Sequence, residues 1–169
     1  MLAKNHSKRY TYHKRKAQGA AAIEFALVLI PLLMIVTGII EFGRTLWYYD
    51  ALTKATRDGA RYLSNVTVAS IGSSAYATTT GNCSTDSLTA DRIVYCAAVA
   101  ANVSGFSLSD VVVSCDGSNC VNNLKPLYVS VSINKYPVTI GGWIPVFLPT
   151  GTTTWTAKLS PRTTMRYMH

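Results

Sequence analysis

The pattern of hydrophobic and polar positions divides the chain into a polar tail, a long apolar segment and a mixed C-terminal part. Residues 20–40 (AAAIEFALVLIPLLMIVTGII) contain one ionisable side chain, Glu24. A helix of this length measures about 32 Å, which is close to the hydrocarbon thickness of a bilayer. No cleavage signal of small residues follows it, as a removable secretory signal would require. The pattern therefore predicts one membrane-spanning helix over residues 20–40 that stays in the protein.

The helix is predicted to continue beyond the apolar segment, to residue 63. Residues 41–63 contain no proline, and oppositely charged pairs such as Lys54 and Asp58 are spaced as on a helix. Apolar or small residues recur every three or four positions and form one stripe. The stripe consists of Leu46, Tyr49, Leu52, Thr56, Gly59 and Leu63. The second half of the helix is thus expected to offer a face to a folded domain.

Two residues within the apolar segment are unusual for a membrane helix. Pro31 removes a backbone donor, and membrane helices accommodate this by local distortion, so we expect a kink or a short unwound stretch near residues 27–31. Glu24 is costly in lipid. It lies about one turn from the start of the segment, where it would complement the helix dipole. The alternative is that Glu24 pairs with a cation that another subunit supplies.

The positive charge of the chain is concentrated in its first 19 residues. The formal net charge is +8, and residues 1–19 hold six of the 16 Lys and Arg residues and no acid. A basic tail directly before an apolar segment predicts a cytoplasmic N-terminus and an exported C-terminal part. Residues 20–169 are nearly neutral, which argues against a nucleic-acid partner. We expect a single-pass protein of the inner (cytoplasmic) membrane.

The C-terminal part, residues 64–169, is predicted to be a small α+β domain. Its first residues, 64–85, are rich in Ser, Thr and Gly and are expected to form a loop. A helix over residues 87–101, capped by Asp86, is expected to turn Leu88, Ile93, Val94 and Ala97 inward. Strands are predicted at residues 110–115, 127–133 and 152–159, with residues 165–168 extending the sheet. The proline-containing stretch 141–151 is predicted to be a loop with an apolar patch, Trp143, Ile144, Val146 and Phe147, that covers the sheet or meets a partner.

The fold class that follows is α+β. A long N-terminal membrane-spanning helix precedes an exported domain with one or two helices and a three- to four-stranded antiparallel sheet. The expected organisation is a leader over residues 1–19, a helix over residues 20–63 and the exported domain over residues 64–169.

All the cysteines lie on the predicted exported side of the apolar segment. An even number of cysteines there is typical of disulfides formed in an oxidising compartment. Four cysteines permit three pairings, and turn residues between Cys115 and Cys120 favour a local bridge, with Cys83 and Cys96 as the companion pair. Buried thiols are the alternative. A structural zinc site would require a second closely spaced pair, so no metal is expected.

The sequence contains no pattern typical of an enzyme. There is no nucleophile elbow, phosphate loop or acid pair near a histidine. The histidines are His6, His13 and His169, none of them within the body of the predicted exported domain. We therefore expect neither catalysis nor a cofactor.

The start of the apolar segment resembles the processing site of type IV pilin-like proteins. A basic leader ends at Gly19, and Glu24 is the fifth residue after it. The ordered set GAAAIEFALVLIPLL, GIIEFGR and ALTKATRDGARYL resembles the N-terminal signature of the TadE-like family over roughly residues 14–64. These are pseudopilins, or minor pilins, of the tight-adherence (Flp-type) pilus. Phe25 departs from the pattern, because pilins of this system often have Tyr there.

The resemblance implies a function and a set of partners. A prepilin peptidase would cut between Gly19 and Ala20, and Glu24 with Phe25 would take part in recognition and assembly. The partners implied are the membrane, other pilin-like subunits and the tight-adherence assembly machinery. An exported domain of this size implies a minor subunit with a priming, tip or assembly role in adhesion or biofilm formation. The alternative function is an unprocessed single-pass protein that anchors a surface binding module.

Overall fold

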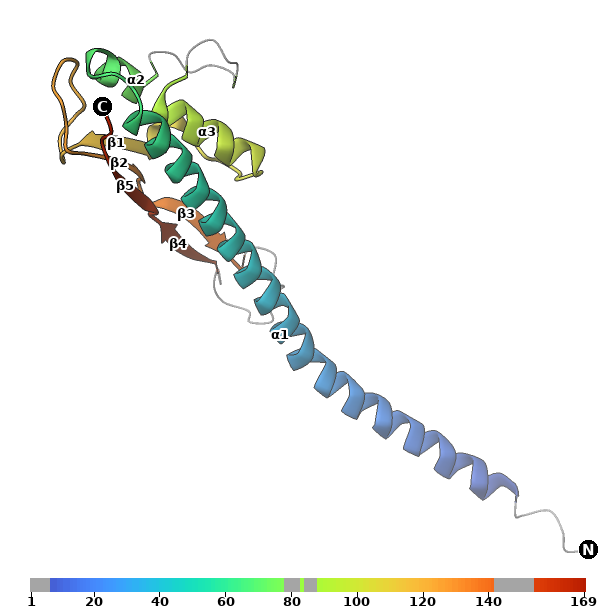
Figure 1. Cartoon of the computed structure of the whole chain (residues 1–169). Helices are drawn as coiled ribbons and strands as arrows, with labels where there is room; N and C mark the ends of the chain where they lie inside the picture. The colour runs from blue at the N-terminus through green and yellow to red at the C-terminus, as the bar shows by residue number, and fades with distance from the viewer. Residues whose placement is uncertain (1–6, 78–82, 84–87, 142–153) are drawn as a thin grey trace, which may run out of the picture. The chain divides into compact units, whose positions relative to one another are not determined.

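The computed structural model describes residues 7–77, 83, 88–141 and 154–169, and describes side chains from residue 19 onward. The chain forms two compact units, Met1–Phe42 and Gly43–His169. Helix α1, Ser7–Ser64, contributes to both units (Figure 1). The two units are described separately below.

In the first unit, α1 is a continuous helix whose apolar side chains are exposed. It runs through Pro31 without the unwound stretch that the sequence analysis allowed near residues 27–31. None of its most hydrophobic 18-residue window is buried. This is the one helix among the described residues that is long and apolar enough to span a membrane. It therefore has the dimensions and the surface of a membrane anchor, as the sequence predicted.

The second unit packs the remainder of α1 with short helices and two antiparallel sheets (Figure 1). The helical elements after α1 are η1 (Val68–Ser70), α2 (Ile71–Ala75), α3 (Ala90–Ala100) and η2 (Leu108–Asp110). The strands are β1 (Val111–Cys115), β2 (Tyr128–Ile133), β3 (Tyr136–Ile140), β4 (Trp155–Leu159) and β5 (Arg162–Arg166). The α+β class is confirmed, with sheets of three strands (β1-β2-β5) and two strands (β3-β4) in place of a single sheet.

A bulge separates the two sheets. The segment that contains β2 and β3 runs antiparallel to the segment that contains β4 and β5, and the two segments contribute to both sheets. Ser132 pairs with Arg162 in the first sheet, and Tyr136 pairs with Leu159 in the second. Three residues lie between these pairs on one side and two on the other, so the β2–β3 segment carries the extra residue. Lys135 within it has a φ of 51°, in the left-handed region. The chain bends here, and the ladder resumes in a new register.

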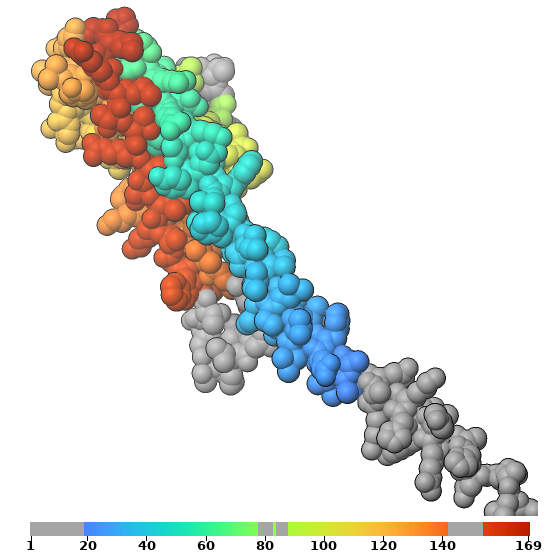
Figure 2. All heavy atoms as spheres, turned by 60° about the horizontal axis from the view of Figure 1, so that its bottom comes forward, coloured from blue at the N-terminus to red at the C-terminus, as the bar shows by residue number. Residues whose placement is uncertain are grey.

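The core of the second unit lies between α1, α3 and the inner faces of the sheets. On the helix, the buried side chains of this unit are Tyr48, Leu52, Ala55, Thr56, Ala60, Leu63 and Ser64. The predicted stripe was right from Leu52 onward, whereas Leu46 and Tyr49 are about half exposed. The strands contribute alternate residues such as Val129, Val131 and Ile133. The C-terminal segment that includes β5 lies beside α1 (Figure 2). The hydroxyls of Thr56 in α1 and Thr163 in β5 share a hydrogen bond of 2.9 Å.

Several details differ from the sequence prediction. The segment predicted as a loop over residues 64–85 contains η1 and α2, which a run of small polar residues did not reveal. Strand β3 was missed, because Pro137 within it disfavours a strand assignment. Strands β1, β2 and β4 confirm their predictions, and β5 begins three residues before the predicted extension at residue 165. The predicted cap Asp86 and the apolar patch at residues 143–147 lie outside the described residues.

Helix α3 is shorter than predicted, and its inward face agrees with the prediction only in part. Val94 is fully buried and Ala97 is partly buried against the core, as predicted. The helix begins at Ala90, and its buried residues are Ala90, Asp91, Arg92, Val94 and Ala98. Leu88, predicted to point inward, is 51% exposed. The prediction followed apolar residues, whereas two of the buried side chains here are charged.

One predicted ion pair on α1 is also replaced. Lys54 pairs with Asp50 at 2.6 Å, not with Asp58. Both spacings place the partner one turn away, so helical periodicity alone did not distinguish them.

Candidate processing and assembly segment

The predicted cleavage position lies within α1, in a part of the helix that no other described residue packs against. Gly19 is exposed, and a Cβ atom added there would meet nothing within 4 Å. Packing within the described structure therefore does not require glycine at this position. A glycine at residue 19 does lower the local helix stability by about 1 kcal/mol relative to alanine. It also leaves the peptide bond before Ala20 without a bulky neighbour.

Glu24 lies one helical turn after Ala20, on the same side of α1. Residues four apart on a helix lie one above the other, and the axial distance between them is about 6 Å. Glu24 is exposed, and the neighbouring apolar side chains Phe25 and Leu27 are 68% and 70% exposed. The segment thus presents a carboxylate within an otherwise apolar surface. Such a group can select a partner that offers a cation at the matching height.

The motif Arg-Asp-Gly-Ala-Arg, at the end of α1, is explained by packing in the second unit. Gly59 and Ala60 are buried, while Arg57 and Arg61 are exposed. A Cβ on Gly59 would lie 2.7 Å from Cγ2 of Val94 and 3.0 Å from the carbonyl oxygen of Ala90. The small residues of this motif therefore allow α3 to approach α1 closely.

Arg44, from the Glu-Phe-Gly-Arg motif, contacts an aromatic cluster of the second unit. Its guanidinium lies 5.4 Å from the ring centroid of Tyr48, and its Nε donates to the Tyr48 hydroxyl at 3.2 Å. Tyr48 meets Tyr136 edge to face, with centroids 6.5 Å apart, and Phe106 packs on Tyr136 at 5.7 Å. Burial raises the pKa of the Tyr136 phenol, which donates a hydrogen bond to the Ser104 carbonyl.

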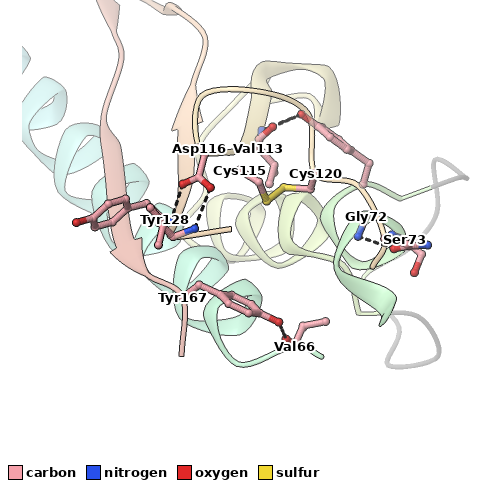
Figure 3. Close-up of a disulfide and its surroundings, with 12 residues drawn as sticks. Val66, Gly72, Ser73, Val113, Cys115, Asp116, Cys120, Tyr128 and Tyr167 are labelled. Atoms are coloured by element: carbon pink, nitrogen blue, oxygen red, sulfur yellow. Dashed lines mark hydrogen bonds between the residues drawn. A yellow bond between two sulfur atoms is a disulfide. The ribbon is translucent and has the colours of Figure 1, made fainter. Parts of the chain in front are cut away.

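Both disulfides have the pairing that the sequence analysis favoured. Cys83 is bonded to Cys96 in α3, with Cα atoms 5.6 Å apart. Cys115, at the end of β1, is bonded to Cys120 across a turn, with Cα atoms 4.9 Å apart (Figure 3). The two bridges account for all four cysteines.

The Cys115–Cys120 disulfide lies in the loop between β1 and β2, and hydrogen bonds hold this loop on both sides of the bridge. Asp116 accepts from the backbone N–H groups of Leu127 and Tyr128, each at 2.8 Å (Figure 3). Asn122 Oδ1 accepts from Gly72 N at 2.7 Å and so connects the loop to α2. The disulfide and these hydrogen bonds together hold the connection between β1 and β2 to α2 and to the start of β2.

Among the described residues, no group of three His, Cys, Asp or Glu side chains could hold a metal ion. The structure does reveal a polar surface that the sequence analysis missed. It lies on the outer face of the three-stranded sheet and includes Arg162, Ser130 and Thr164. The spacing of Arg162 and Arg166 by four residues, which places both on one face of a strand, was the available signal once these residues were known to be a strand.

The architecture is that of a protein with one N-terminal apolar anchor helix and a disulfide-stabilised α+β domain. Residues 19–61 match the family model described as TadE-like protein. The match confirms the resemblance predicted from the sequence, and relates the chain to pilin-like proteins of the tight-adherence pilus. No curated protein and no solved structure shows a significant match.

Proposed function

We propose that this chain is a minor pilin-like subunit of a tight-adherence pilus, matured by a prepilin peptidase and used in pilus assembly and adhesion. The observation that carries the proposal is the coincidence of two features. The TadE-like match begins at Gly19, and the helix that follows exposes an apolar surface interrupted by Glu24.

Cleavage after Gly19 would change how the helix interacts with the membrane. Residues 1–19 carry six basic side chains and no acid, so they hold the N-terminus at the cytoplasmic face. Their removal takes away this electrostatic anchor and leaves a helix that begins at Ala20. The helix can then leave the bilayer, because other helices of the same kind can cover its apolar surface in place of lipid.

The new amino group at Ala20 supplies a cation for a neighbouring subunit. A neighbour's Glu24 meets this group when the two helices are displaced along their axes by about one turn, roughly 6 Å. In a low-dielectric helix bundle a paired carboxylate is tolerated, whereas an unpaired one is costly. The pair therefore specifies the axial register more than it adds stability.

The second unit is the exported part in this proposal. Its two disulfides are of the kind that persists in oxidising compartments outside the cytoplasm. Its core and two sheets give it a folded surface of its own. A subunit with such a domain suits a priming or tip position, because a bulky domain on every shaft subunit would hinder close packing of the helices.

An unprocessed single-pass anchor is the competing function, and N-terminal mass analysis separates the two. We would isolate the chain from membranes and from sheared pili and measure its intact mass. The proposal expects the mature protein to begin at Ala20, and Gly19→Leu to retain the leader. Gly38→Ala is the matched control, since a Cβ there also meets nothing within 4 Å. Fully functional protein that retains Met1–Gly19 would refute the proposal.

A further inference from the structure

The outer face of the three-stranded sheet is polar and basic. On β2, Val129, Val131 and Ile133 point into the core, so Ser130 and Ser132 belong to the opposite face. The cross-strand pairs place β1 and β5 residues beside them. The outer face thus comprises Val112, Ser114, Tyr128, Ser130, Ser132, Arg162, Thr164 and Arg166. Hydroxyl side chains fill its centre, and two arginines lie along its β5 edge.

A hydrogen-bond network orients one of these arginines. Arg162 Nε donates to Ser130 Oγ at 2.8 Å, and the Ser130 and Thr164 hydroxyls are 3.1 Å apart. Ser130 is only 5% exposed, so its hydroxyl is a fixed acceptor for the guanidinium. One of the five donors of Arg162 is thereby used to set the direction of the others. A preoriented guanidinium loses less side-chain freedom when it binds a ligand.

A groove of about 510 Å³ lies on this face. It is lined by Asp116, Gly117, Leu127, Tyr128, Ser130, Arg162 and Thr164. Both oxygens of the Asp116 carboxylate accept hydrogen bonds, from the backbone N–H groups of Leu127 and Tyr128. Tyr128 is 53% exposed and adds an aromatic ring to the groove.

We propose that this face binds an acidic polysaccharide, a chain of uronate sugars, through Arg162 and Arg166. The two arginines are four residues apart on one strand, so their Cα atoms are separated by about 13 Å. At this spacing each guanidinium can hold a carboxylate of its own, which suits carboxylates that repeat along a polymer. A guanidinium pairs with a carboxylate through two parallel hydrogen bonds. Thr164, an exposed residue between the arginines, offers a hydroxyl to sugar hydroxyls, and the Tyr128 ring matches a sugar face.

The inference goes beyond pilus assembly, because it assigns a ligand to the second unit. It depends on the outer sheet face alone and not on cleavage at Gly19. An uncleaved chain would bind the polymer equally well, so failure of one proposal leaves the other standing.

The test measures binding of the full chain, in detergent micelles, to immobilised polygalacturonate at low ionic strength. Arg162→Gln with Arg166→Gln is expected to weaken binding about tenfold or more, because charge-assisted hydrogen bonds are lost. Arg162→Lys keeps the charge but not the paired N–H donors of the guanidinium. Its loss of affinity is expected to be most of that caused by Arg162→Gln alone. The matched control is Arg57→Gln with Arg61→Gln, two exposed arginines of α1, which remove the same charge.

The result that supports the proposal is selective loss in the sheet-face variants, with neutral dextran unbound. Equal weakening in the Arg57 and Arg61 control would show a nonspecific charge effect and overturn the assignment. Equal affinity for a DNA duplex of similar charge would do the same, since a nucleic acid would then be an equivalent ligand. Absence of binding to polygalacturonate would also overturn it. Near-ultraviolet circular dichroism establishes that each variant is folded.

Discussion

Gly59 of α1 and Val94 of α3 lie so close together that the helix pair has no room for a methyl group. A Cβ on Gly59 would be 2.7 Å from Val94 Cγ2 and 3.0 Å from a backbone oxygen, which cannot move aside as a side chain can. This contact defines the approach of the two helices. It also gives a physical reason for a glycine inside a helix, where glycine is otherwise unfavourable.

Gly59→Ala is therefore expected to destabilise the second unit. Overpacking costs about 1–3 kcal/mol, and the better helix propensity of alanine offsets about 1 kcal/mol of it. We expect a net loss of up to about 2 kcal/mol in the free energy of unfolding, measured by urea denaturation of the full chain. Gly43→Ala is the control, because nothing lies within 4 Å of its added Cβ, and it should be neutral or stabilising. If Gly59→Ala were as stable as Gly43→Ala, the close contact between Gly59 and Val94 would be contradicted.

Glu24→Gln is expected to block assembly while leaving maturation intact. The variant keeps the shape of the side chain but cannot form the charge pair with a neighbour's amino terminus. The measurement compares the intact mass of the membrane-bound protein with the amount recovered in sheared pili. Asp50→Asn is the control, since it removes one acid from an exposed surface ion pair. If Glu24→Gln entered pili at the wild-type level, the proposed role of the carboxylate would be wrong.

Asp91, in the first turn of α3, binds the backbone of Ala77, which follows α2. Its two carboxylate oxygens accept from the backbone N–H of Ala77 at 3.0 and 2.9 Å, and one also accepts from the Thr89 hydroxyl at 2.6 Å. The side chain is 3% exposed. Asp91→Ala leaves these donors unsatisfied, at a cost of about 1–3 kcal/mol.

The variant is expected to raise the hydrogen-exchange rate at Ala77 by more than the loss of global stability accounts for. Mass-detected exchange of the full chain measures this directly. Asp50→Asn again serves as the comparison, and it should leave exchange at Ala77 unchanged. An unaltered rate at Ala77 in Asp91→Ala would mean that the hydrogen bonds of Asp91 do not hold this segment.

Stability is expected to fall at high pH because of two buried tyrosines. Burial raises the pKa of Tyr136 and of Tyr167 above the ordinary value of 10.0, so the folded state retains protons that the unfolded state releases. The stabilisation is fully present below about pH 10 and is lost as the pH rises further. Tyr136→Phe should be less stable at neutral pH, because it lacks the bond to Ser104, but should lose less stability between pH 9 and about 11.

Thermal unfolding at a series of pH values checks this prediction. Tyr49→Phe, at a residue that is 48% exposed, is the matched control and should follow the wild-type curve. The same slope for Tyr136→Phe and the wild type would show that this phenol does not contribute to the alkaline loss of stability.

Local patterns were sufficient wherever one physical effect dominated. The apolar run at residues 20–40 indicated an anchor helix, because burying so many apolar side chains needs either lipid or other helices. Turn residues between Cys115 and Cys120 favoured their bridge, because a short loop already brings the two sulfurs together. Alternation in residues 127–133 predicted β2. These features depend on neighbours in sequence, and so the sequence by itself determined them.

Only the tertiary structure decided the features that depend on residues far apart in the chain. Helix α3 buries Asp91, because the backbone N–H of Ala77 in another segment satisfies its carboxylate, and no periodicity reports that partner. The strand containing Pro137 forms because the bulge at Lys135 lets the ladder resume. Arg162 meets Ser130 across 32 residues through strand register, which sequence spacing does not encode. Register and packing select among several arrangements that are equally compatible with local pattern, and that selection requires the whole fold.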